Sequence, residues 1–421
     1  MKLLNLRRDK MKVAVIGYGG RGRLYTDILK QNTSTEIVAI CDCDKEKLAL
    51  AQKELGVSEE TLFCSEKEFF EQEKLADILF VCTQDELHFG HAIKGLEKGY
   101  DLLLEKPIAC SMEECRAIES KAKELNRNIF VCHVLRYTPF YMGIKKQLDS
   151  GKFGKVISLS TTENVAYWHQ AHSYVRGNWN NDKCATPMII AKCCHDLDLI
   201  SWFMDDNCES VSSFGSLSVF KAENAPNDSA EYCLDCSLKA TCPYSAEKIY
   251  IKDRAEKGKL GWPCDIIVNE PTVEKLYTAL KTSKYGKCVY KCDNNVVDHQ
   301  VVNLQFKNGG TAQLTMTAFS EECFREIRLH CENGDISGNM IDNVLTCNIF
   351  GKESYKIDVN IDSDTDYGHG GGDLGMLQTL VDFYDGNGSL TTTISESMQS
   401  HYMGFAAEES RKKNGKVVKL A

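Results

Sequence analysis

The segment MIIAKCCHDLDLISWF at positions 188–203 gathers side chains that could do chemistry inside an apolar stretch. Histidine titrates near neutral pH and can accept a proton, and lysine can stabilise a developing negative charge. On a helix, residues three or four apart share a face and adjacent residues do not, so Lys192 and His195 would line one side. Cys193 and Cys194 would point away from that side. The three side chains of Cys193, Cys194 and His195 would therefore be badly arranged to bind one metal ion. The segment is therefore either a buried helix with satisfied polar side chains or one wall of a catalytic site.

A glycine-rich turn near the N-terminus is the second chemical feature. It follows an apolar run and contains Gly17, Gly19, Gly20, Arg21 and Gly22. Its glycines permit a tight turn and close backbone approach, while the helix that follows offers its N-terminal amides to a pyrophosphate. A second apolar strand ends at Asp42, about 20 residues further on, where a dinucleotide-binding fold places the acid that binds the ribose hydroxyls. Because this acid would repel a 2′-phosphate, the pattern predicts NAD rather than NADP.

A cluster of cysteines is the third feature. Its members, at C-x2-C-x5-C spacing plus one distant residue, are Cys233, Cys236, Cys242 and Cys288. Four thiolates could hold a structural zinc ion in a tetrahedron, with Cys292 or Cys264 as other fourth ligands. The alternative is a set of reduced, unligated thiols, the default for the 20 cysteines of a chain without a secretion signal. With zinc, residues of about 225–295 would be an insertion folded around the metal, because this loop-like segment would otherwise lack a core.

The elements around these features alternate between strand and helix in the first third of the chain. Predicted strands are 76–84, 101–107 and 127–135, and a predicted helix covers 88–99. This alternation predicts a parallel sheet with right-handed crossovers. Ligands bind at the carboxyl ends of such strands, where Thr83, Glu105 and Lys106 fall.

After about residue 135 the pattern changes to longer alternating segments. Asn308-Gly309-Gly310 predicts a hairpin between two of them, and 395–415 predicts a helix that a glycine ends. We expect a large, mostly antiparallel open sheet, with one face toward the active site and the other free to pair with a second subunit. The predicted fold class is α/β, with a dinucleotide-binding domain at 1–134 and a substrate-binding and oligomerisation domain at 135–421.

The composition of the chain limits its partners. Its 421 residues are 43% hydrophobic and 26% charged, as in globular proteins. The net charge of −10, without a basic block, excludes a nucleic-acid partner. The N-terminal segment lacks the apolar run of a signal peptide, and no segment offers the ~20 apolar residues of a membrane helix. We therefore expect a soluble, cytoplasmic protein without a membrane partner.

The glycine-rich turn and four further motifs together resemble the Gfo/Idh/MocA oxidoreductases, the glucose-fructose oxidoreductase and inositol dehydrogenase superfamily. The motifs are Thr83 followed by His88, Glu105-Lys106-Pro107, Arg136-Tyr137 and His195-x-x-Asp198. The resemblance runs along nearly the entire chain, and its E-K-P motif is the most specific part. Gln84 stands where the family often has proline, so we expect a local change of loop shape there.

The resemblance implies the roles of individual residues. Lys106 and His195 would lie beside the nicotinamide, with Lys192 joining them in catalysis. Cofactor contacts beyond the turn and Asp42 would come from Thr83, His88, Glu105, Lys106, Arg136 and Trp179. Many members carry aspartate where this chain has Ala191, so Asp198 could orient the His195 imidazole instead.

Two polar segments supply candidate substrate contacts. HSYVRGNWN at 172–180 and YGHGGGD at 367–373 have loop-like compositions, and a purely structural loop explains each of them equally well. The candidates for substrate binding are Tyr174, Arg176, Lys192, Asp198 and His369.

Three functions are compatible with these residues. The first is NAD-dependent hydride transfer between the nicotinamide and a ring hydroxyl or ketone of a sugar, cyclitol or glycoside. The second is redox-neutral glycoside cleavage, in which tightly bound NAD oxidises the sugar transiently and returns the hydride after elimination. The third is a non-catalytic NAD-binding sensor. In each case we expect a small carbohydrate-type ligand and a homo-oligomer, either a dimer or a tetramer.

Overall fold

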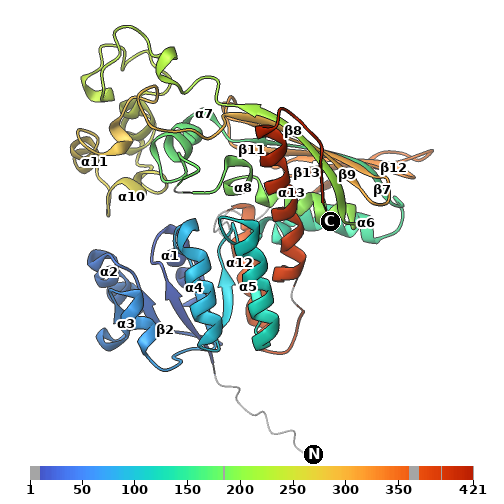
Figure 1. The fold of residues 1–421 in the computed structure, drawn as a ribbon, viewed down its shortest axis with the longest axis horizontal. Coiled ribbons are helices and arrows are strands. Elements are labelled where there is room, and N and C mark those ends of the chain that lie inside the picture. Colours follow the sequence, from blue (N-terminus) through green and yellow to red (C-terminus); the bar gives the residue numbers. More distant parts are fainter. Residues whose placement is uncertain (1–9, 184, 360–368, 390, 421) are drawn as a thin grey trace, which may run out of the picture.

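The computed structural model describes residues 10–183, 185–359, 369–389 and 391–420 (Figure 1). These residues form two β-sheets that lie at different ends of the molecule, one of six strands and one of nine. The expected α/β class is confirmed.

The six-stranded sheet is built from the first third of the chain. Its strands are β1 (Met11–Ile16), β2 (Thr35–Cys41), β3 (Leu62–Phe63), β4 (Ile78–Val81), β5 (Asp101–Leu104) and β6 (Ile129–Val131). Every pairing is parallel, in the order β3-β2-β1-β4-β5-β6. The connecting helices are α1 (Gly20–Leu29), α2 (Lys45–Leu55), α3 (Glu66–Glu71), α4 (Asp85–Glu97) and α5 (Met112–Leu125). Strand order reverses between β1 and β4, which places the ligand crevice at their carboxyl ends.

The nine-stranded sheet is mostly antiparallel. Its strands are β7 (Val156–Asn164), β8 (Cys208–Ser216), β9 (His299–Phe306), β10 (Thr311–Thr317), β11 (Phe324–Cys331), β12 (Gly334–Asn339), β13 (Val344–Ile349), β14 (Tyr355–Asp358) and β15 (Val418–Lys419). Among the described strand pairings of this nine-stranded sheet, only that of β7 with β10 is parallel. The predicted hairpin is confirmed, because β9 and β10 pair across a turn in which Gly309 has a φ of +87°.

Helices cover one face of this large sheet. α6 (Pro139–Asp149) packs against β13, α9 (Cys194–Met204) against β7, and α13 (Ile394–Lys412) against β8. The expected helix at 395–415 is thus confirmed as α13, which begins with a capping box between Thr393 and Glu396. The opposite face exposes alternate residues of its strands, as the period of two requires.

An insertion between β8 and β9, residues 217–298, folds around an apolar core that it shares with Ala171, Val175 and Ala318. It contains the short helices α10 (Cys264–Ile267) and α11 (Val273–Ala279) and several single turns. Its buried centre includes Phe220, Ile249, Tyr250, Leu276 and Leu280. The expectation that this segment would lack a core without metal is therefore wrong. Its apolar residues lie on short helices separated by polar loops, so the sequence shows no long apolar pattern there.

The end of the chain returns to the first sheet. α12 (Gly372–Tyr384) contributes Met376, Leu377 and Leu380 to the apolar cluster on one side of that sheet. The start of α13 contributes Ile394 and Met398 to the cluster on the other side. The domain boundary after residue 134 stays a prediction, and the core of the first sheet includes residues from beyond it.

The described helices include none with the length and apolarity that crossing a bilayer requires.

Candidate active site

The turn between β1 and α1 leaves no room for side chains. Gly17 has a φ of +95°, and a Cβ built on it would lie 2.6 Å from the carbonyl oxygen of Cys82. A Cβ on Gly22 would lie 2.2 Å from the carbonyl oxygen of Gly17. By contrast, a Cβ on Gly19 would meet nothing within 4 Å. The turn therefore has glycine where the backbone needs it and an open backbone surface at Gly19.

Asp42 lies next to this turn, directly after β2. Its Oδ2 accepts a hydrogen bond from the Tyr18 amide at 2.7 Å, and its Oδ1 accepts one from the Asp44 amide at 2.9 Å. These bonds orient the carboxylate, and each oxygen keeps a lone pair for a further donor. The arrangement is what a ribose diol requires.

Arg21 joins three elements through buried carboxylates. Its Nε donates to Glu105 at 2.8 Å, and its guanidinium also binds Asp373 of α12. Burial disfavours the charged form of Glu105, but the charges of Arg21 and Lys106 outweigh it and lower its pKa. Burial also opposes the charge of Asp373, yet Arg21 and His369 lower its pKa to about 2. Arg21, predicted to contact the cofactor, is thus engaged mainly with protein carboxylates.

Lys106 follows β5 and donates from Nζ to the carbonyl oxygen of Ala191 at 2.9 Å. Its neighbour Pro107 has its carbonyl oxygen 2.7 Å from Nδ1 of His88, and Nε2 of His88 lies 3.1 Å from the carbonyl oxygen of Thr83. Both ring nitrogens of His88 thus link the loops after β4 and β5. The prediction that Thr83 and His88 contact the cofactor stays a prediction, and the contacts of His88 show a positioning role.

The continuous helix expected over 188–203 is wrong. One helix, α8 (Met188–Ala191), ends before Lys192, and α9 begins at Cys194. Lys192 at the break has φ −106° and ψ −51°, outside regular helix geometry. Lys192 consequently faces β7, whereas His195 faces His133 and His369.

His195 is buried, with 4% of its surface exposed, and its Nδ1 has no hydrogen-bond partner among the described residues. Its ring centre lies 5.9 Å from that of His133 and 5.8 Å from that of His369. Burial lowers the pKa of His195 well below its ordinary value, and the nearby charge of Lys106 lowers it further. The imidazole is therefore neutral at neutral pH and able to accept a proton.

Asp198 does not orient His195, so that expectation is wrong. The Asp198 carboxylate accepts two hydrogen bonds of 2.7 Å from Nε and Nη2 of Arg136. Arg136 also donates to the carbonyl oxygen of Thr391 at 2.9 Å. Because both groups are buried and mutually satisfied, they serve as a bidentate link between the two parts of the chain rather than as cofactor or substrate ligands.

A buried charge network lies on the other side of Lys192. Nζ of Lys192 is 3.3 Å from Glu163 Oε1, and Arg325 reaches Glu163 at 2.7 Å and Asp196 at 2.8 Å. Burial opposes the charge of Lys192, but Glu163 raises its pKa. Burial and the neighbouring Glu163 raise the pKa of Asp196 to about 6, although Arg325 opposes the shift. Sequence reasoning missed Glu163 and Arg325, because they come from separate strands and belong to no recognisable motif.

His369 belongs to the same region as His195. Its Nδ1 lies 2.9 Å from Oδ2 of Asp373, the carboxylate that also binds Arg21. Burial lowers the pKa of His369 despite Asp373. Tyr367 and Gly368 of the YGHGGGD segment lie outside the described residues. His133, which sequence reasoning missed, completes a row of three histidines, and burial lowers its pKa to about 4.

The expected polar loop at 172–180 is largely a buried helical turn, because residues Gln170–Arg176 form one irregular helix. Tyr174 lies within it, with its ring centre 5.9 Å from His169 and 6.4 Å from Trp179. Trp179 in turn donates from Nε1 to Asp85 at 3.2 Å. Tyr174 thus lies between His169 and Trp179, and the predicted contacts of Tyr174 with substrate and of Trp179 with the cofactor stay predictions.

The Arg176 guanidinium is engaged with protein atoms, and its role as a substrate ligand stays a prediction. It donates to the carbonyl oxygens of Lys287 and Tyr244, each at 2.7 Å, and to Sγ of Cys233 at 3.4 Å. The side chain is fully buried inside the insertion and helps to hold it together.

The predicted zinc site is not supported. Within the described residues no group of three or more histidine, cysteine, aspartate or glutamate side chains is arranged to hold a metal ion. The four candidates instead line a cavity of about 190 Å³ whose wall is mostly apolar: Cys233, Cys236, Cys242 and Cys288. The apolar core of the insertion supplies the stability for which the sequence argument invoked a metal.

The strand order reverses at the carboxyl ends of β1 and β4, a switch point of the kind at which parallel sheets bind ligands, and Lys106 after β5 and His195 on α9 belong to this part of the molecule. The chain belongs to the Gfo/Idh/MocA oxidoreductase family. Residues 11–133 match the model of its NAD-binding Rossmann fold, and residues 145–420 match that of its C-terminal α/β domain.

Similar proteins carry names of related activities. YteT of Bacillus subtilis (strain 168), which has the name of an oxidoreductase, is 24% identical over 66% of this chain and 64% of its own length. An inositol 2-dehydrogenase/D-chiro-inositol 3-dehydrogenase of Lacticaseibacillus casei is 25% identical over 48% of this chain and 55% of its own. The matches thus span less than two thirds of these curated relatives.

Two solved structures share the fold along nearly the whole chain. Levoglucosan dehydrogenase in complex with NADH and levoglucosan has a TM-score of 0.71 and 16% identity, covering 98% of this chain and 100% of that one. The WlbA dehydrogenase from Bordetella pertussis, in complex with NADH and UDP-GlcNAcA, has a TM-score of 0.69 and 16% identity, covering 98% of each chain.

Proposed function

We propose that this protein is an NAD-dependent oxidoreductase that transfers hydride between the nicotinamide and a ring hydroxyl or ketone of a sugar, cyclitol or glycoside. The observation that carries the proposal is the buried, neutral His195 close to the charge of Lys106, at the carboxyl edge of the parallel sheet. The family and the carbohydrate names of the relatives support the same class of substrate.

The residues of the crevice fit NAD. Gly17 lets the turn pack against the backbone of Cys82, and Gly19 presents open backbone where a pyrophosphate needs close approach. The two oriented oxygens of Asp42 match the ribose hydroxyls and favour NAD over NADP. When bound, NAD supplies the acceptor for the hydride that leaves the substrate carbon.

The protein residues handle the proton and the charge. The neutral imidazole of His195 accepts the hydroxyl proton as the C–H bond breaks. Lys106 uses one Nζ hydrogen on Ala191 and has two left to hold the substrate oxygen and stabilise its developing charge. Lys192, paired with Glu163 at 3.3 Å, would contact another hydroxyl of the substrate. In the reverse direction His195 returns the proton to the alkoxide.

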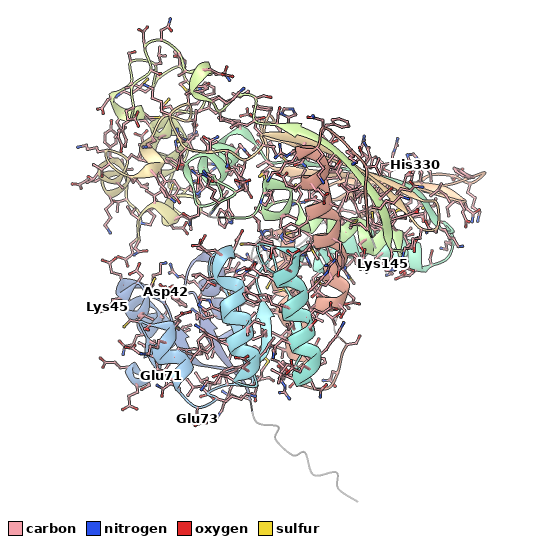
Figure 2. All side chains as sticks on the ribbon, in the orientation of Figure 1. Asp42, Lys45, Glu71, Glu73, Lys145 and His330 are labelled. Carbon is pink, nitrogen blue, oxygen red and sulfur yellow. The ribbon has the colours of Figure 1, made fainter. Side chains whose placement is uncertain are left out.

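A panel of sugars and cyclitols with added NAD tests this function. Lys106→Met and His195→Asn should each reduce kcat/KM by at least about 100-fold, the usual loss of a general acid-base group. Lys145→Met and His330→Asn are matched controls, because both side chains lie on the large sheet region, far from Asp42 (Figure 2). Full turnover in the Lys106 and His195 variants would reject the proposal.

Redox-neutral glycoside cleavage is the second candidate, and His369 favours it. Elimination next to a transient ketone needs a second base, and His369 lies beside His195 with a carboxylate partner. We expect release of nitrophenol from a nitrophenyl glycoside without added NAD. His369→Asn should then abolish nitrophenol release while NAD reduction by the sugar persists, whereas equal loss of both would remove the reason for this candidate.

The exposed face of the large sheet supports a homo-oligomer. It carries the exposed apolar side chain of Phe214 on β8, on the face opposite to the buried Val302 of β9. Pairing of two such faces would bury them. Light scattering on the purified protein should give the mass of a dimer or tetramer, and Phe214→Glu should shift it toward the monomer.

A further inference from the structure

The insertion turns large apolar side chains toward the cofactor crevice. Within residues 262–269, Trp262 is 48% exposed and Ile266 is 40% exposed, although both belong to a segment whose neighbours form a packed core. The α10 and α11 part of the insertion lies on the same side of the molecule as α1 and α2 (Figure 1). Exposed apolar groups beside a binding site indicate a surface that a ligand covers.

The segment 262–269 approaches the first sheet at two places that the cofactor must pass. Cδ1 of Ile266 lies 3.8 Å from the position of a Cβ on Gly20, in the pyrophosphate-binding turn. Nδ2 of Asn269 donates to Oε2 of Glu46 at 3.1 Å, just after Asp42 on the ribose side. Burial raises the pKa of Asp265, and the charge of Arg23 on α1 opposes this shift.

The other end of the segment packs against His169. The Trp262 ring lies 4.8 Å from that of His169, and the charges of Lys192 and Lys106 both act on His169. Trp262 is held in place by Trp168 at 5.5 Å, over which Arg254 stacks at 4.0 Å. The contacts of the segment thus follow the order of a dinucleotide: nicotinamide end, pyrophosphate, ribose.

We propose that residues 262–269 form a second wall of the NAD crevice and slow the release of bound NAD. The proposal rests on the proposed NAD-dependent function and adds the residues that hold the cofactor from outside. Ile266 would exclude water from the pyrophosphate, and the Asn269–Glu46 hydrogen bond would close the ribose end. Because residues 262–269 must move before NAD leaves, the dissociation of NAD would be slower than from an open crevice.

The dissociation rate of NADH from the full-length protein tests this wall. NADH fluorescence is followed after mixing with excess ADP-ribose. Ile266→Asp should raise the dissociation rate constant at least tenfold, because it adds a negative charge beside the pyrophosphate. Val273→Asp is the matched control: Val273 is an exposed apolar residue of the same insertion, at the start of α11, where an aspartate is well tolerated.

A double-mutant cycle tests the closing hydrogen bond. Asn269→Ala and Glu46→Ala should each raise the rate constant a few-fold, and the double variant should add little, because both remove one interaction. Circular dichroism verifies that each variant is folded. Rates equal to wild type in folded Ile266→Asp and Asn269→Ala would overturn the wall. A wild-type protein that binds no NADH would instead refute the proposed function on which it rests.

Discussion

His195 is set up as a base by its surroundings rather than by a partner. Buried beside Lys106, it gains no stabilisation as a cation, so its pKa falls. Sequence reasoning could place His195 and Lys106 together only through the family motifs. It could not find His133 or Glu163, because a side chain becomes part of a site through tertiary contacts that no local pattern records.

The pH dependence of catalysis should reflect this depressed pKa. The base is active when neutral, so kcat/KM for substrate oxidation should stay flat as the pH falls through about 6.5, the ordinary histidine value, and decline only well below it. Initial rates across the acidic range, at saturating NAD, give the profile. An acidic limb centred near 6.5 would contradict the neutral, buried imidazole.

Two glycines of the same turn should respond differently to alanine. Gly17→Ala places a methyl group against the Cys82 carbonyl at positive φ, so we expect a loss of about 1–3 kcal/mol in the free energy of unfolding together with loss of NAD binding. Gly19→Ala meets no protein atom, so the stability should stay near wild type while NAD binding weakens. Urea unfolding and calorimetric titration separate the two effects, and equal stability of both variants would contradict the geometry.

At the scale of elements, the positions of Lys192 and His195 depend on where α8 ends and α9 begins. The break between α8 and α9 turns Lys192 and His195 to different walls, and the periodicity of 188–203 gave no sign of it. The strands and helices of the first sheet were predictable, because hydrophobic runs and glycine turns alternate there. The insertion was not, because its short helices bury few residues each.

The Arg21 network ties α1, β5 and α12 together, and it should be visible in acid stability. The pKa of Asp373 is about 2 in the folded protein, below its ordinary value of 3.8. A carboxyl group whose pKa is lower in the folded protein adds to the free energy of unfolding. This contribution is present in full when the pH is above the ordinary pKa of 3.8, and it is lost as the pH falls through about 2. Asp373→Asn should therefore cost about 2 kcal/mol at neutral pH.

The unfolding free energies of wild type and Asp373→Asn should converge between about pH 4 and pH 2. Denaturant titrations at several pH values measure the difference. A difference that stays constant down to pH 2 would show that Asp373 acts through packing alone. Asp235→Asn, a change in an exposed carboxylate of the insertion, is the matched control.

At the scale of the whole molecule, the insertion is a third folding unit that composition concealed. Leu276 is fully buried in its core, so Leu276→Ala should cost about 2–5 kcal/mol. Hydrogen exchange should show the loss mainly in residues 217–298, with the first sheet unchanged. Chelator treatment, by contrast, should leave exchange in the insertion as it was, because apolar burial holds it together.

The return of α12 and α13 to the first sheet has a consequence for synthesis. The Val131 amide donates to the carbonyl oxygen of Thr392 at 2.9 Å, and Met376, Leu377 and Leu380 complete an apolar cluster beside strands that are synthesised well before them. While the chain emerges from the ribosome, those strands lack the helix that covers them. Their apolar surface therefore stays open to chaperones until α12 and α13 have been made.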